Sequence, residues 1–255
     1  GLSFDSPAKN ELESVNPEYL YNQELKAMES KNVEMGIKGY LMARERDFMR
    51  KILFEATLFY INVSNEIVPF EVFGDVFFRN AARTNRRGVE LGSSLELFRG
   101  LDFTGAYTYS NFDYKEYETV VIILDPEGNV ITEEEDFSGN IVPSVPEHNL
   151  YLSLSYSYPF HHNLNGFAKF SYMGVSKLWV DDANSDHTDS YQLLNGVLGM
   201  DMSFGKLNIL VSGSLNNMLD VVYVGFTNTN SADRRFFEAG APRNYFVTLN
   251  IGYTF

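Results

Sequence analysis

The last residues of the chain, NYFVTLNIGYTF (residues 244–255), decide the fold. Every second residue, beginning with Tyr245 and ending with Phe255, is apolar, and Phe246 is the one large apolar side chain among the positions between them. This period of two predicts a β-strand with one apolar face and one polar face. The strand of about 11 residues is longer than a typical soluble strand and matches the ~9 to 11 residues of a tilted transmembrane strand.

The same alternation recurs along the chain, cleanly in some segments and weakly in others, and predicts nine long strands. They cover residues 33–42, 49–63, 87–98, 101–109, 149–158, 164–172, 194–204, 207–215 and 245–255. Short links alternate with long ones at 64–82, 111–148, 175–190 and 225–243. This layout is typical of an antiparallel up-and-down transmembrane β-barrel, with short turns in the periplasm and long loops outside the cell. The longest loop contains a further predicted hairpin around residues 125–129.

The composition supports a barrel and excludes several classes of protein. Acidic residues outnumber basic ones by 34 to 20, a net charge of −14, and they crowd the long loops. Nucleic-acid binding is excluded because it requires clustered Lys and Arg. The chain has no cysteine, and no apolar run approaches the ~18 residues of a transmembrane helix. A soluble β-sandwich alternates in the same way, but membrane-length strands, small polar residues on the second face and aromatic strand ends favour the barrel.

The odd number of predicted strands indicates that the chain does not close a barrel by itself. Closed barrels of one bacterial chain have an even number of strands, and an open sheet would leave unpaired edges in lipid. We therefore expect residues 33–255 to be a portion of a larger barrel that other strands close. Residues 1–32 are then expected to form an extracellular loop or rim segment, in which Asn16 and Pro17 favour a short helix over residues 19–30 or an extended loop.

Four stretches, taken in order, resemble the C-terminal barrel portion of the TonB-dependent receptors of Gram-negative outer membranes. NP (16–17) and LKAMESKNVEMGIKG (25–39) are similar to the family's entry into a strand, with AM where PE is usual. FRNA (78–81) followed by GVELG (88–92) is similar to a second family segment. NNMLD (216–220) with Tyr223 resembles an N-L-F-D…Y signature, with Met in place of Leu and Leu in place of Phe. PRNY (242–245) and the strand to Phe255 resemble the closing strand.

The resemblance implies that these are the last nine strands of a 22-strand barrel that is plugged by an N-terminal globular domain. The plug domain and the first strands are absent from residues 1–255. The implied partners are the rest of the receptor, which a separate chain could supply, and TonB, reached through that missing part. BAM-type assembly machinery would read Tyr253 and Phe255 as the assembly signal. The other implied partners are lipopolysaccharide in the outer membrane and a small-molecule ligand.

Candidate ligand-binding residues lie at the outer ends of strands and in the loops. Guanidinium groups suit an anionic chelate or lipopolysaccharide phosphates, although pairing with loop acids is an alternative. Aromatic rings could stack on a flat ligand or pack the loop. The candidates are Arg83, Arg86, Arg87, Tyr223, Arg234, Arg235 and Phe236.

Metal binding and catalysis have weaker support in the sequence. Asp181, Asp182 and Asp186 could bind calcium, but an acidic exposed loop explains them more simply. The pair His161-His162 lies in a short turn and is expected to be solvated rather than a metal pair. Because no catalytic motif is present, we expect neither an enzyme nor a bound cofactor.

The first functional hypothesis is that the chain is part of a TonB-dependent active transporter that imports a scarce ligand, such as a ferric siderophore or similar chelate. The alternative is a passive outer-membrane pore or a surface adhesin built on the same strands. Both hypotheses place the chain in the outer membrane as an integral β-barrel.

Overall fold

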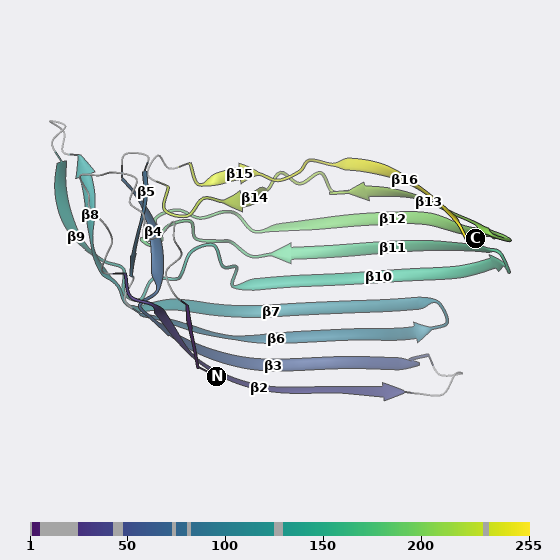
Figure 1. Cartoon of the computed structure of the whole chain (residues 1–255), viewed down its shortest axis with the longest axis horizontal. Helices are drawn as coiled ribbons and strands as arrows, with labels where there is room; N and C mark the ends of the chain where they lie inside the picture. The colour runs from purple at the N-terminus through teal and green to yellow at the C-terminus, as the bar shows by residue number, and fades with distance from the viewer. Residues whose placement is uncertain are drawn as a thin grey trace.

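The computed structural model describes residues 2–5, 25–42, 48–72, 75–80, 83–124, 130–231 and 235–255. Ten strands form one sheet in the order β1-β2-β3-β6-β7-β10-β11-β12-β13-β16, and each pairs antiparallel with its neighbours (Figure 1). The strands are β1 (Leu2–Asp5), β2 (Met28–Met42), β3 (Lys51–Ser64), β6 (Arg83–Phe98), β7 (Leu101–Glu116), β10 (His148–His161), β11 (Leu164–Val175), β12 (Tyr191–Phe204), β13 (Leu207–Asn216) and β16 (Asn244–Tyr253).

The two ends of the sheet differ, and we call them the turn end and the loop end. At the turn end, links as short as Arg99-Gly100 join consecutive strands; Gly100 has a φ of +85°, and a Cβ there would lie 2.1 Å from the Ser157 carbonyl oxygen. The loop end carries three hairpins: β4 (Ile67–Val72) with β5 (Asp75–Asn80), β8 (Glu118–Leu124) with β9 (Val130–Asp136), and β14 (Val224–Thr227) with β15 (Phe237–Ala239). Figure 1 shows β4, β5, β8 and β9 standing across the direction of the sheet strands.

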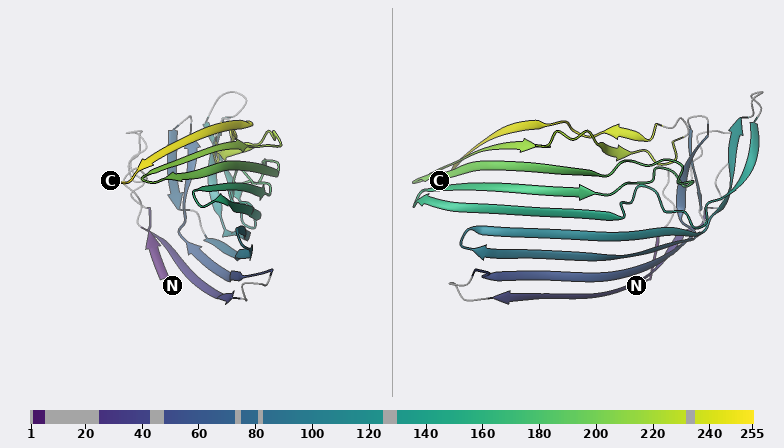
Figure 2. Two further views of the ribbon diagram at one scale, coloured as in Figure 1. Left: turned by 90° about the vertical axis from the view of Figure 1, so that its right-hand side faces the viewer. Right: turned by 180° about the vertical axis from the view of Figure 1, so that it is seen from behind.

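The sheet is a curved wall rather than a closed barrel. Seen nearly along its strands, it bends through an arc with the β1–β2 pair and β16 on opposite sides (Figure 2, left). Its order runs linearly from β1 to β16, so these two edges do not pair within the described residues. Closure of such a wall in lipid requires further strands, because unpaired backbone groups are costly there.

The two faces of the wall have opposite chemistry. Large apolar side chains occupy alternate positions and are widely exposed: Val33 is 69% exposed, Leu198 62% and Leu249 61%. The register aligns these positions from strand to strand, so that they form one continuous apolar face. A patch of this size is typical of a surface covered by lipid. The described residues contain no helix long and apolar enough to cross a membrane.

The nine long strands predicted from the sequence are confirmed, and their bounds agree most closely at the turn end. Predicted ends at residues 42, 98, 101, 164, 204 and 207 are the ends in the structure. At the loop end the strands run further than predicted; β7, for example, continues to Glu116 instead of ending at residue 109. The hairpin in the longest loop is confirmed as β8 and β9, although residues 125–129 lie outside the described part.

The prediction for residues 1–32 is wrong in two places. Leu2–Asp5 forms β1, a tenth strand of the sheet, and β2 begins at Met28 instead of residue 33. The alternative of a helix over residues 19–30 is contradicted at residues 28–30: Met28 pairs with β1, and Glu29 and Ser30 pair with both β1 and β3. Residues 19–24 lie outside the described part. Pairing on both sides satisfies the backbone of this polar segment and overrides the local helix-start signal.

Candidate functional site

A buried core lies at the loop end, beyond the region of apolar alternation. Val68 of β4, Tyr114 near the end of β7 and Tyr117 form its centre, with Phe137 and Val142 packed against it. The rings of Tyr114 and Tyr117 are 4.7 Å apart between centroids, and those of Tyr117 and Phe137 are 5.2 Å apart. Segments from several loops therefore fold on one another as a packed unit.

Asp182 is the polar centre of this unit and is only 3% exposed. Its carboxylate accepts hydrogen bonds from the Tyr114 hydroxyl (2.7 Å), the Tyr117 hydroxyl (2.9 Å) and the Asn230 amide (3.0 Å). The Asp182 backbone N–H donates to Asn230 Oδ1 (2.9 Å), and its carbonyl accepts from Asn140 Nδ2 (2.8 Å). We call these five residues the Asp182 cluster. It connects the outer end of β7 with three long loops.

The electrostatics of the cluster follow from its burial. Loss of solvent raises the pKa of the Asp182 carboxyl, and the donated hydrogen bonds from Tyr114, Tyr117 and Asn230 limit the rise. Burial, followed by the nearby Asp182 charge, raises the pKa of the Tyr117 hydroxyl, while Arg79 opposes the rise. Tyr117 therefore stays a neutral donor, and the Arg79 guanidinium both donates to its oxygen (3.2 Å) and lies 5.7 Å from its ring centroid.

The three candidate metal ligands have separate roles in the structure. Asp181 accepts from the Ser185 backbone N–H (2.7 Å) and hydroxyl, Asp182 is enclosed by its cluster, and Asp186 accepts from the backbone N–H of His187 (2.8 Å). Across the described ranges, no three His, Asp or Glu side chains are grouped so that they could hold a metal ion.

The candidate arginines of β6 do not form one cluster, because neighbours in a strand point to opposite faces. Arg86 lies on the polar face, pairs with Glu66 and places its guanidinium 5.7 Å from the Phe112 ring centroid. Arg87 lies in the row of the apolar face and donates to Asn111 (2.8 Å).

The remaining arginines lie in other surroundings. Arg83 forms an exposed ion pair with Glu116 at 3.2 Å. Arg235 is exposed, and Arg234 lies outside the described residues.

The two candidate aromatic residues near the last loop differ in exposure. Phe236 is 4% exposed, so its ring belongs to the loop packing. Tyr223 is partly exposed and pairs with Tyr191, with 4.7 Å between ring centroids. Tyr191 begins β12 in the row of the polar face, and sequence reasoning missed it because it lies beyond the apolar alternation of that strand.

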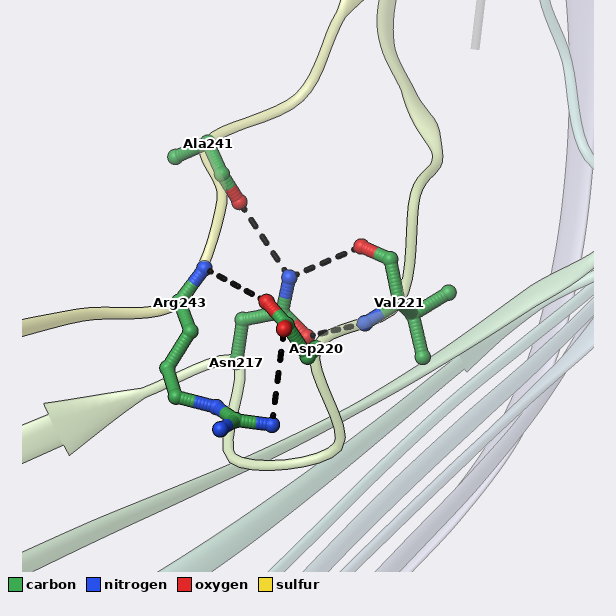
Figure 3. A network of polar contacts seen from close by, with 5 residues as sticks. All are labelled: Asn217, Asp220, Val221, Ala241 and Arg243. Atoms are coloured by element: carbon green, nitrogen blue, oxygen red, sulfur yellow. Dashed lines mark hydrogen bonds and ion pairs between the residues drawn. The ribbon is translucent and has the colours of Figure 1, made fainter.

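Two of the sequence motifs meet in space, as Figure 3 shows. Asn217 accepts from the Val221 N–H (2.9 Å), while its amide donates to the carbonyls of Val221 (2.8 Å) and Ala241 (3.3 Å). The Asp220 carboxylate accepts a hydrogen bond from the backbone N–H of Arg243 (3.4 Å) and forms an ion pair with the Arg243 guanidinium (3.6 Å). The loop after β13 is thus joined to the segment that enters β16.

The terminal aromatic residues lie at the turn end. Tyr253 is 58% exposed, and its ring meets that of Phe255 edge-on at 5.3 Å between centroids. Their role as an assembly signal stays a prediction.

Comparison with known proteins accounts for this architecture. The sequence pattern of the family described as "TonB dependent receptor-like, beta-barrel" matches residues 1–229. The ferrioxamine receptor of Yersinia enterocolitica is 25% identical over 99% of this chain and 32% of its own length. The structure of the ferric-catecholate import receptor Fiu from E. coli K12 superposes with a TM-score of 0.62, at 18% identity, over 100% of this chain and 32% of that one.

The ferric yersiniabactin uptake receptor FyuA from Yersinia pestis superposes with a TM-score of 0.59, at 19% identity, over 90% of this chain and 30% of that one. The chain thus spans about a third of the length of the relatives it matches. The resemblance noted in the sequence is confirmed, as is the all-β fold, and neither the family nor these relatives are enzymes. The chain belongs to the TonB-dependent receptors, and it forms part of their outer-membrane β-barrel.

Proposed function

We propose that this chain is part of an outer-membrane active transporter that binds a scarce ligand, a ferric siderophore or a similar chelate, and imports it with energy delivered through TonB. The observation that carries the proposal is the match of the family pattern to residues 1–229, together with the alignment of a ferrioxamine receptor over 99% of the chain. Two solved relatives are also named as receptors for ferric chelates.

The loop end supplies a suitable surface for such a ligand. The Asp182 cluster holds several loops in one arrangement, which lowers the entropy cost of binding. The Tyr191–Tyr223 pair presents aromatic rings at the polar face, where a flat chelate can stack. Exposed Arg235 offers a guanidinium to an anionic chelate, and we propose the same role for its sequence neighbour Arg234. Arg83, Arg86 and Phe236 support this surface through their existing contacts.

The partners proposed for the intact receptor follow from the two faces and two ends of the wall. The polar face would enclose the plug domain, and TonB would act through that plug. BAM-type machinery would bind the terminal strand with Tyr253 and Phe255, and lipopolysaccharide would surround the loop end of the apolar face. The localisation is the outer membrane of a Gram-negative cell.

Uptake by whole cells tests the proposal. A strain without its own siderophore receptors would express the intact receptor that contains this chain, and the measurement is accumulation of radioactive iron from ferrioxamine and from a ferric catecholate. We expect uptake of one chelate that requires TonB and falls when Tyr223→Ala and Arg235→Ala are combined. Uptake of unrelated small solutes without TonB would contradict active transport and favour the passive pore.

A further inference from the structure

Toward the loop end of β2, β3, β6 and β7, the apolar face ends in a row that contains an arginine. This row consists of Val33, Tyr60, Arg87 and Asn111, which pair directly from strand to strand. Between this row and the turn end, the described residues of these four strands place no charged side chain on the apolar face. The Arg87 guanidinium is thus the first charge that these strands present beyond the apolar part of the face.

The position of Arg87 along β6 corresponds to the level of the lipid headgroups. The stretch of β6 from Arg87 to Phe98, at the turn end, rises about 36 Å at ~3.3 Å per residue. With a strand tilt of about 35–45°, this is about 26 to 30 Å along the membrane normal, just beyond the ~25 Å apolar band of such barrels. The neighbouring Tyr60 is 44% exposed and fits this level, because Tyr is enriched at membrane interfaces.

The Arg87 guanidinium is held in place without being neutralised. Its Nε donates to Asn111 Oδ1 (2.8 Å), which leaves its two Nη groups without a partner in the described residues. Arg87 is exposed, and no carboxylate in that part of the chain forms an ion pair with it. A guanidinium binds phosphate through paired N–H groups, so this side chain is available to a phosphate at the membrane surface.

A second cation lies in the next row toward the loop end. Lys31 is exposed and forms no ion pair within the described ranges. The acid of the same row, Asp113, is 8% exposed and is paired with Lys115 at 2.8 Å. Glu29 and Arg83 occupy the row beyond, further from the lipid. The boundary of the apolar face therefore bears net positive charge, although the chain as a whole has a net charge of −14.

We propose that Arg87 and Lys31 form a binding site for the phosphates of lipopolysaccharide in the outer leaflet. Because Arg87 faces the lipid, it does not contact a ligand enclosed by the polar face, and an anionic headgroup is the partner that its charge and level fit. The acyl chains lie against the apolar rows that begin with Val33 and Tyr60. The site rests on the proposed location of the loop end at the cell surface, but not on the identity of the imported ligand.

Native mass spectrometry of the intact receptor tests the site, with a short-core lipopolysaccharide titrated into a detergent solution. We expect binding weaker by about tenfold in Arg87→Gln, which loses a charge-assisted phosphate contact. Arg87→Lys keeps the charge without the paired N–H groups and should recover only part of the binding. Lys31→Gln should weaken binding by a smaller factor, because an ammonium is a single flexible point charge. The matched control is Lys38→Gln, which removes a cation from the polar face of the same strand and should bind as the unmodified protein does.

Removal of the phosphates from the same lipopolysaccharide separates the headgroup contacts from the acyl contacts. The dephosphorylated lipid should bind the unmodified protein and Arg87→Gln equally. Equal binding of the phosphorylated lipid by the unmodified protein and by the double variant Arg87→Gln, Lys31→Gln would overturn the proposal, as would an equal loss in Lys38→Gln. Stronger binding of phosphatidylglycerol than of lipopolysaccharide would also overturn it, because the site would then hold a phospholipid.

Two further measurements keep these results interpretable. Heat-modifiable migration on gels shows that each variant is folded. Uptake of the ferric chelate is measured separately in the same strains, so that a failure of the lipid site and a failure of the transport proposal are distinguished.

Discussion

Asn217 gives the sharpest stability prediction, because one buried amide holds two segments of the last loop. The side chain is 3% exposed and makes three hydrogen bonds to the backbone of Val221 and Ala241. Asn217 also has a φ of +48°, a left-handed conformation that Asn tolerates better than Ala. A substitution therefore acts through lost hydrogen bonds, through backbone strain, or through both.

Two substitutions separate these contributions. Asn217→Gly keeps the favourable backbone and loses the amide, which should cost about 2 to 3 kcal/mol for the lost bonds and the backbone groups left unpaired. Asn217→Ala loses the same bonds and adds about 1 to 2 kcal/mol of left-handed strain. Asp220→Asn is the control: its ion pair with Arg243 is 3.6 Å long and largely exposed, so the change should cost at most about 1 kcal/mol.

Hydrogen exchange at the Val221 amide of the intact receptor measures the effect directly, since Asn217 Oδ1 accepts from this group. Each ~1.4 kcal/mol of lost protection accelerates exchange tenfold. We expect the rate to rise in the order unmodified, Asp220→Asn, Asn217→Gly, Asn217→Ala. Faster exchange in Asn217→Gly than in Asn217→Ala would refute the strain argument. An effect of Asp220→Asn as large as that of Asn217→Gly would refute the role of the buried amide.

Three further predictions concern the faces and the loop unit. Leu249→Lys places a charge on the apolar face and should cost about 2 to 4 kcal/mol in unfolding from lipid vesicles, whereas Asn250→Lys on the polar face should cost under about 1 kcal/mol; equal costs would contradict the assignment of the faces. Arg86→Leu leaves the Glu66 carboxylate, which is 13% exposed, without its cation, and should lower the free energy of unfolding by about 3 kcal/mol in denaturant titrations. Adding Glu66→Gln to the same protein should partly restore the lost stability. The pKa of Asp182 in the folded protein is raised above the ordinary 3.8. The Asp182 carboxyl therefore contributes fully to loop stability below pH 3.8, and this contribution declines as the pH rises through the raised pKa. In Asp182→Asn, loop stability measured by hydrogen exchange at several pH values should not show this decline.

The parts of the fold that the sequence predicted are those where lipid constrains the side chains. A residue on the apolar face must be hydrophobic, so the alternation in β12 and β13 marks their turn ends at residues 204 and 207 correctly. At the loop end the strands extend beyond the lipid, so their outward-facing residues no longer have to be hydrophobic. The outer part of β7 and the polar start of β2 therefore carried no periodic signal, and the four residues of β1 are too few to show one.

The loop unit was harder to predict because its contacts join residues far apart in the chain. Tyr114 and Tyr117 reach Asp182 across 68 and 65 residues, and an acidic loop gives no sign that one of its acids is buried. The sequence grouped Arg83, Arg86 and Arg87 by proximity, although strand geometry sends Arg86 and Arg87 to opposite faces. The sequence motifs around Asn217 and Arg243 were recognised separately, and only the fold shows that they meet.

Cysteine labelling of intact cells tests the membrane topology most directly, because residues 1–255 contain no cysteine and, within them, a single introduced one reports one position. In the intact receptor, Asp186→Cys lies at the loop end and Lys206→Cys at the turn end. A membrane-impermeant maleimide should label the first on whole cells and the second only after the outer membrane is opened. Labelling of Lys206→Cys on whole cells, with protection of Asp186→Cys, would contradict the orientation on which the proposed ligand surface depends.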